Sequence, residues 1–331
     1  MKKIIKSKST AILLSIIFFT IVFITVNSQE SVSRTSEGTP HWKNLVKNAP
    51  FPGRSAHSAT VFNNKLWIIG GWKGNKVFND IWSSKDGISW QCVTKKAPFR
   101  ARAAHGVIVF KNKMWLIGGL YFNKNKDIRD LNDIWHSKDG VNWVKAKTSA
   151  RFSSRGGHRL LVFKKQLWII GGIATTADIW VSSDGIKWRN VVAQTEFSSR
   201  GGHSALVFNN KLWVIGGIYV DQNNKFNSLS DVWTSNNGVK WTKATEETSF
   251  FAGGGHSASV YNNRIWVMGG FRKSGTVFAT SDGIDWKDID LSASFGERVA
   301  HTCTVFKGKM WVIGGYNGAD HKNDIWFSEF K

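Results

Sequence analysis

Five arginines in this 331-residue chain occupy corresponding positions in a recurring segment, and their chemistry suits acidic groups. They are Arg54, Arg102, Arg155, Arg200 and Arg298, and Gly253 stands at the sixth position. Clustered guanidinium groups hold carboxylates through paired, charge-assisted hydrogen bonds. The same five segments carry an aspartate further on, at Asp80, Asp133, Asp178, Asp231 and Asp324, where the sixth has Thr276. The segment that lacks the arginine also lacks the aspartate, which would fit an ion pair between the two residues. Two interpretations therefore stay open: the arginines bind a ligand, or each arginine forms an ion pair with the aspartate of its own segment.

Six histidines recur in the same segments, 45 to 53 residues apart, at His57, His105, His158, His203, His256 and His301. A single metal ion needs three or four converging ligands, which a sixfold repeat does not favour. We therefore predict that these histidines are structural, and that the protein has no metal site and no cofactor.

The elements that must position these residues are short β-strands. In the first copy, an alternating segment over 57–62 is followed by an Asn-Asn-Lys turn, the apolar run 66–71 that ends in Gly-Gly, the segment 80–82, and a Ser-Lys-Asp-Gly turn before Trp90. Short alternating segments bounded by Asn, Asp and Gly indicate antiparallel strands joined by tight turns. We name the four strands of each copy a (His), b (Gly-Gly), c (Asp-Ile-Trp) and d (the last Trp).

Six copies of about 50 residues, each with four strands and Gly-Gly at the end of strand b, resemble the kelch repeat of β-propellers. The resemblance covers about residues 41–330. It implies an all-β fold, a six-bladed β-propeller of four-stranded antiparallel blades. The sixth copy ends after strand c, and Trp42 precedes Arg54 by the same interval as Trp90 precedes Arg102. We therefore expect the N-terminal segment His41 to Val46 to be strand d of the last blade and to close the ring.

Seventeen of the 18 tryptophans fall on strands b, c and d, where we expect them to pack between blades. Phe278 replaces the strand c tryptophan of the fifth copy. Only Trp72 lies outside the repeat, directly after Gly-Gly.

Strand direction places the b–c and d–a connections on one face, together with the start of strand a. We expect this variable face to carry function. The kelch resemblance implies that the arginines can line a central mouth there. Trp72, Tyr121, Phe271 and Tyr316 are aromatic candidates for the same binding face, with packing at the blade tops as the alternative. The long, polar b–c connections run from Tyr121 to Asp130 and from Tyr219 to Leu229.

The predicted function is an exported kelch-repeat binding module whose b–c/d–a face takes a protein or an acidic glycan. The alternative is a carbohydrate-active propeller enzyme resembling sialic-acid mutarotase or sialidase. For that alternative, Glu196 and Glu297 are the acids expected nearest the pocket. Since a general acid must be positioned by its surroundings and spacing alone does not show this, we favour binding over catalysis.

The first 28 residues precede the repeat and have the pattern of a secretory signal peptide. A basic stretch with Lys2, Lys3, Lys6 and Lys8 is followed by an apolar run over 11–26. Residues 1–28 are therefore a cleaved signal peptide or a retained membrane anchor, residues 29–40 a linker, and residues 41–331 the propeller. We expect a secreted or periplasmic protein, tethered to the membrane if the segment is retained.

The formal net charge of +22 would also suit a nucleic-acid ligand, but the lysines are dispersed over turn positions. Together with export, this argues against a nucleic-acid ligand. We also expect the protein to be a monomer. Cys92 and Cys303 fall on an outer and an inner strand, so we expect no disulfide and two buried free thiols.

Overall fold

The structure is a computed structural model that describes residues 38–173, 177–221, 223, 225–248, 253–271, 275–290 and 292–330. The predicted signal peptide or anchor over 1–28 and most of the linker lie outside these ranges. Within them, no helix has the length and apolar character needed to cross a membrane.

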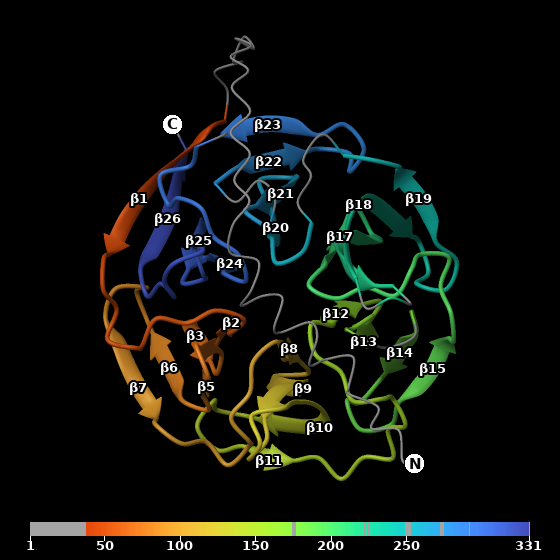
Figure 1. Ribbon diagram of the computed structural model, residues 1–331, viewed down its shortest axis with the longest axis horizontal. Coiled ribbons are helices and arrows are strands. Elements are labelled where there is room, and N and C mark those ends of the chain that lie inside the picture. Colours follow the sequence, from red (N-terminus) through yellow and green to blue (C-terminus); the bar gives the residue numbers. More distant parts are fainter. Residues whose placement is uncertain are drawn as a thin grey trace.

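Six four-stranded antiparallel sheets stand around a central axis, as Figure 1 shows. Strand a of each sheet is nearest the axis and strand d is on the perimeter. The prediction of a six-bladed, all-β propeller is therefore confirmed. A short two-stranded hairpin is added to blade one.

The strand bounds follow the repeat. Blade one has β2 (Ser58–Phe62), β3 (Lys65–Ile69), β6 (Ile81–Ser84) and β7 (Trp90–Thr94), with the added hairpin β4 (Trp72–Lys73) and β5 (Lys76–Val77). Blade two has β8 (Gly106–Phe110), β9 (Lys113–Phe122), β10 (Ile128–Ser137) and β11 (Val144–Lys145). Blade three has β12 (Arg159–Phe163), β13 (Gln166–Ile170), β14 (Ile179–Ser182) and β15 (Arg189–Val192).

The second half of the ring is built in the same order. Blade four has β16 (Ser204–Phe208), β17 (Lys211–Val220), β18 (Phe226–Ser235) and β19 (Thr242–Thr245). Blade five has β20 (Ser257–Tyr261), β21 (Arg264–Met268), β22 (Val277–Thr280) and β23 (Lys287–Asp290). Blade six has β24 (Thr302–Phe306), β25 (Lys309–Ile313), β26 (Ile325–Phe330) and, from the other end of the sequence, β1 (Pro40–Val46).

The ring closes through β1, as the position of Trp42 predicts. β1 pairs antiparallel with β26, placing Trp42 opposite Ser328. Figure 1 shows these strands, from opposite ends of the chain, side by side on the perimeter. An ion pair of 2.6 Å between Lys43 and Glu329 spans the same two strands. Closure leaves β26 without an open edge.

The histidine and the Gly-Gly pair of the repeat fit together at each blade boundary. A Cβ atom on Gly71 would lie 2.7 Å from the Cβ of His57 in the same blade. A Cβ on Gly70 would lie 2.9 Å from Cε1 of His105 in the next blade. Only glycine leaves room for the imidazole rings, and the Gly71 amide also donates to the Arg102 carbonyl at 2.9 Å. The recurrence of His and Gly-Gly is therefore a packing requirement between blades.

The repeated tryptophans pack between blades, as predicted. One apolar cluster, for example, joins Trp67 of blade one to Trp135 and Trp143 of blade two. The Trp67 ring lies over Gly140 in the c–d turn of blade two, where a Cβ would approach it to 2.3 Å. The remaining five blade boundaries have equivalent clusters.

Candidate functional site

The arginine that precedes strand a is held inside its own blade. In blade two, Arg102 donates to both carboxylate oxygens of Asp133, at 2.6 and 2.8 Å. Its remaining N–H groups donate to the carbonyl oxygens of Gly118 at 2.8 Å and Arg100 at 3.0 Å. The Arg102 side chain is completely buried. Asp133 accepts a further hydrogen bond from Trp135 Nε1 at 2.7 Å, so one aspartate positions two side chains of the repeat.

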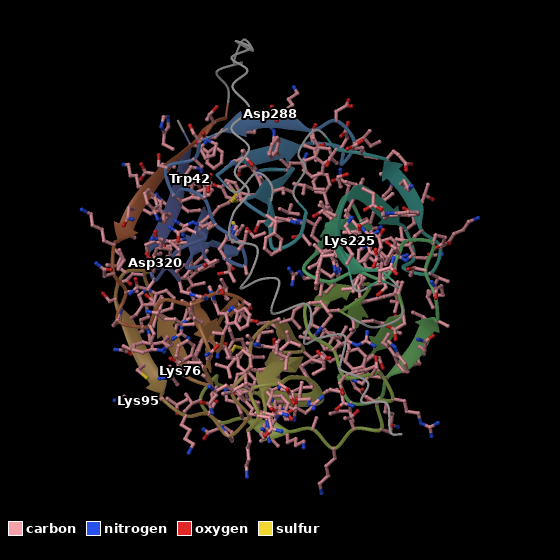
Figure 2. All side chains as sticks on the ribbon, in the orientation of Figure 1. Trp42, Lys76, Lys95, Lys225, Asp288 and Asp320 are labelled. Carbon is pink, nitrogen blue, oxygen red and sulfur yellow. The ribbon has the colours of Figure 1, made fainter. Side chains whose placement is uncertain are left out.

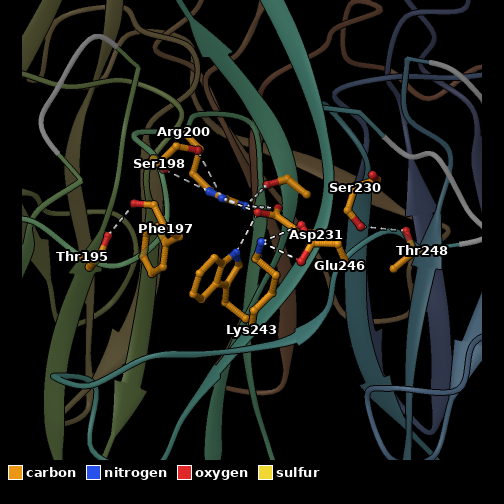
Figure 3. A network of polar contacts seen from close by, with 11 residues as sticks. Thr195, Phe197, Ser198, Arg200, Ser230, Asp231, Lys243, Glu246 and Thr248 are labelled. Carbon is orange, nitrogen blue, oxygen red and sulfur yellow. Dashed lines mark hydrogen bonds and ion pairs between the residues drawn. The ribbon is translucent and has the colours of Figure 1, made fainter.

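Blade four shows the same arrangement in Figure 3. Arg200 donates to both oxygens of Asp231, at 2.6 and 2.9 Å, and lies 5.2 Å from the centre of the Phe197 ring. Burial alone would raise the pKa of Asp231, but the hydrogen bonds and charge of Arg200 lower it below the usual aspartate value. The network therefore stays ionised at neutral pH.

All five arginines form this ion pair, with 0 to 2% of the side chain exposed. None of the five is among the residues that line the central cavity. The sequence left open whether the arginines bind a ligand or pair with aspartates, and the structure shows each arginine paired with the aspartate of its own blade. The guanidinium of each arginine already donates its hydrogen bonds to protein oxygens. The five arginines therefore do not form an open binding site for an acidic ligand in this conformation.

The central cavity has a volume of about 290 Å³ and is lined by the start of every innermost strand. A closed circle of six backbone hydrogen bonds surrounds it, each amide donating to a carbonyl of the preceding blade at 2.7 to 3.0 Å. The six residues have left-handed backbone conformations with φ between 50° and 73°. Glycine adopts that conformation without steric cost, and the absence of large side chains keeps the channel open; the residues are Ala56, Ala104, Gly157, Gly202, Gly255 and Ala300.

The aromatic candidates lie in different places. Trp72 is buried and lines the cavity, with Nε1 donating to Ser55 Oγ, and Phe271 is half-buried and also lines it. Tyr121 lies outside the cavity lining, where the guanidinium of Arg100 stacks 4.3 Å from its ring centre. Tyr316 is also outside the lining, and its hydroxyl donates to Gly318 O at 2.6 Å. The four candidates therefore do not form one site.

The two acids considered for catalysis are exposed on d–a loops, and neither lines the cavity. Glu196 lies between blades three and four, and Glu297 lies directly before Arg298. No aspartate or glutamate occurs among the residues that line the cavity. Both cysteines are free thiols. Cys92 is exposed, so its predicted burial is wrong, because it lies on the outermost strand β7. Cys303, on the innermost strand β24, is half-buried rather than buried.

The two long b–c connections are paired hairpins rather than irregular loops. Beyond an irregularity in each ladder, β9 and β10 stay paired as far as Phe122 and Ile128, and β17 and β18 as far as Val220 and Phe226. Asn123 Oδ1 and Asp221 Oδ1 close the two turns by accepting backbone amides. The two arms therefore extend from the b–c/d–a face as paired strands.

The β9–β10 arm joins the small β4–β5 hairpin through an apolar cluster. Trp72 stacks on Phe122 with ring centres 6.1 Å apart, and Leu120 and Ile128 complete the buried part. Exposed cationic side chains surround this cluster on both hairpins and on the d–a loop between blades one and two. We call this surface the basic rim; its cations are Lys73, Lys76, Arg100, Lys124 and Lys126. Figure 2 labels Lys76 in blade one.

Two features of the site escaped the sequence analysis. A phenylalanine three positions before each paired arginine is buried edge-to-face on a strand d tryptophan, as Phe99 is on Trp143. The recurring Phe-x-x-Arg spacing could have shown it. Arg159, at the start of β12, lines the central cavity, and its position directly after the repeat histidine was the available signal.

The fold and the interlocked Arg, Asp, His and Gly-Gly residues define a β-propeller built from a kelch-type repeat. Comparison with known proteins agrees with this class. A KLHDC2/KLHL20/DRC7 Kelch-repeats domain matches residues 29–172, and a Kelch motif matches residues 297–326. The chain is a kelch-repeat β-propeller.

Similar proteins add little detail about function. Leucine-zipper-like transcriptional regulator 1 from Mus musculus and from Homo sapiens is 57% identical over 30 residues, which is 9% of this chain. The match spans only 4% of the length of those curated relatives. A solved structure described as "Structure of YjhT" superposes with a TM-score of 0.66 over 86% of this chain and 96% of that one, at 14% identity. That likeness concerns the fold alone.

Proposed function

We propose that this chain is an exported binding module whose basic rim captures an acidic segment of a partner protein. The observation that carries the proposal is the rim itself, an apolar cluster on two hairpins with five exposed cations around it. Kelch propellers generally mediate protein interactions, which supports a protein partner. Phe122 and Val77 are only partly buried at the edge of this cluster. Together with the cations they favour a segment that combines carboxylates with aromatic or aliphatic side chains.

Export and monomeric behaviour belong to the same proposal. Export is supported by the basic stretch and apolar run over residues 1–28. An acidic glycan is the other ligand that the rim's charge suits. The carbohydrate-active alternative is weaker, because Glu196 and Glu297 lie outside the cavity lining.

The test compares charge reversal on the two faces of the propeller. Lys76→Glu, Arg100→Glu and Lys126→Glu together reverse three of the five charges of the basic rim. Lys111→Glu, Lys211→Glu and Lys307→Glu make the same change in net charge at exposed a–b turns on the opposite face. The probes are an array of acidic peptides with and without aromatic residues, and an array of sialylated and uronic-acid glycans.

We expect salt-dependent peptide binding that the rim variant loses and the opposite-face variant keeps. Equal loss in the two variants would mean that only net charge matters and would reject the rim. Binding of glycans but not of peptides would reject the protein partner.

A further inference from the structure

One position near the axis breaks the sixfold pattern. The residue directly after each repeat histidine is the first residue of the innermost strand and lines the central cavity. Five of these residues are small and one is a large cation; they are Ser58, Gly106, Arg159, Ser204, Ser257 and Thr302. The repeat therefore does not need an arginine here, and Arg159 calls for an explanation of its own.

Arg159 has none of the partners that hold the five paired arginines. Its hydrogen bond is a long one of 3.4 Å, from Nη1 to the carbonyl oxygen of its neighbour His158. In the described part of the chain it forms no ion pair, and no carboxylate lines the cavity. Burial lowers the pKa of Arg159 to about 10, so the side chain stays protonated at neutral pH. A half-buried cation without a protein counter-charge is expensive to maintain.

The histidines around Arg159 do not add positive charge. Burial, together with the nearby arginines, lowers the pKa of His158 to about 3, and the charge of Arg159 contributes to this shift. His203 and His256 are affected by Arg159 in the same way. At neutral pH the three imidazoles are uncharged, so Arg159 is the cation of this cavity wall.

His105 and His158 line the cavity at the repeat position directly before that of Arg159, and their Nε2 atoms are buried and form no hydrogen bond with described residues. The planar guanidinium of Arg159 matches the two oxygens of a carboxylate.

The loop-side wall of the same cavity is apolar. Trp72, Leu120, Ile173, Ile218 and Phe271 line it there, each just after the Gly-Gly pair of its blade. A volume of about 290 Å³ accommodates a small organic molecule rather than a folded segment of protein. The cavity thus combines one cation with apolar walls.

We propose that the central cavity binds a small organic anion, with its carboxylate on the Arg159 guanidinium and its apolar body within the channel. The cavity shares Trp72 and Leu120 with the apolar cluster of the basic rim. Its cation, Arg159, is none of the five cations of the rim, so the proposal does not depend on the proposed capture of a partner protein.

The test measures binding of benzoate, butyrate and inorganic sulfate to the full chain by isothermal titration calorimetry, with benzamide as the uncharged counterpart of benzoate. Arg159→Ser is the central variant, because serine occupies the same position in blades one, four and five. Arg189→Ser is the matched control, since it removes the same charge from an exposed site on the outer strand β15.

We expect benzoate to bind the wild-type chain and Arg189→Ser with equal affinity and to bind Arg159→Ser about tenfold or more weakly. Benzamide should bind weakly or not at all. Unchanged benzoate affinity in Arg159→Ser would overturn the proposal, as would equal binding of benzoate and benzamide. If sulfate bound as tightly as benzoate, the proposed contribution of an apolar ligand body to binding would be overturned.

Arg159→Lys and the stability of the ligand-free chain provide a second readout. Lysine keeps the charge but not the planar fork, so benzoate should bind this variant with intermediate affinity. Ligand-free Arg159→Ser should unfold at the same or a higher temperature than the wild type, because an unpaired, half-buried charge is removed. A clearly lower midpoint would make Arg159 a scaffold residue and would contradict the proposal.

Discussion

The paired arginines show how a chemically versatile side chain becomes part of a scaffold. Each one joins strand a, the Gly-Gly carbonyl of strand b and the aspartate of the Asp-Ile-Trp segment, as Arg102 does with Gly118 and Asp133. The carbonyl of the same arginine accepts an amide from the preceding blade. Blade five keeps only this backbone contact, through Gly253 O. The arginine side chain therefore organises its own blade, whereas its backbone links two blades.

Removing the partner of a paired arginine should destabilise the propeller strongly. Asp133→Ala leaves Arg102 buried without a counter-charge, for which we expect a loss of about 3–5 kcal/mol in the free energy of unfolding. Urea denaturation followed by tryptophan fluorescence measures this change. Asp127→Ala removes a carboxylate whose side chain is 42% exposed and should change stability by less than about 0.5 kcal/mol. Similar midpoints for the two variants would contradict a structural role of the ion pair.

At the scale of elements, β1 is the strand that completes the ring. It covers the outer edge of β26 and brings Trp42 against Phe295, with ring centres 4.9 Å apart. The sequence predicts this strand because Trp42 keeps the spacing of the other strand d tryptophans. The arms formed by β9–β10 and β17–β18 were harder to predict. Their polar residues are compatible both with an irregular loop and with a pair of solvent-exposed β-strands.

A chain that begins at Lys47 should therefore be much less stable than one that begins at Gly38. The shorter chain lacks β1, exposes the edge of β26 and loses a buried tryptophan, which alone is worth about 3–5 kcal/mol. Differential scanning calorimetry of the two chains measures the effect, and Trp42→Ala in the longer chain separates the side chain from the strand. Identical unfolding of the two truncated chains would reject the closure of the ring by β1.

For the whole molecule, sixfold repetition concentrates neutral histidines around the axis. Burial lowers the pKa of every repeat histidine, to about 3 for His57, His158 and His256 and well below its usual value for the other three. The unfolded chain binds these protons near pH 6.5, whereas the folded chain does not. Folding stability from this source is therefore complete above about pH 6.5 and is lost as the pH falls below it.

The propeller should consequently unfold in mild acid. Each histidine contributes a slope of about 1.4 kcal/mol per pH unit below pH 6.5, and six acting together exceed the stability of a typical domain within one or two units. Thermal unfolding between pH 7.5 and 4 measures this slope, which His203→Asn should reduce. The exposed His41 provides the control, because His41→Asn should leave the slope unchanged. A midpoint that stays constant from pH 7 to pH 5 would contradict this prediction.

By itself, the amino-acid sequence determined the propeller, the number of blades, the position of the repeated tryptophans and the closure by β1. These features follow from local spacing, because each repeat carries its strand pattern and turn residues within about 50 positions. Only the tertiary structure decided what the arginines do, since Arg102 and Asp133 lie 31 positions apart and their contact depends on how strands a and c are placed. The same is true of Arg159, which stands in an otherwise ordinary alternating strand. Its special environment arises because six chain segments far apart in sequence meet at one axis and none of their cavity-lining residues is a carboxylate.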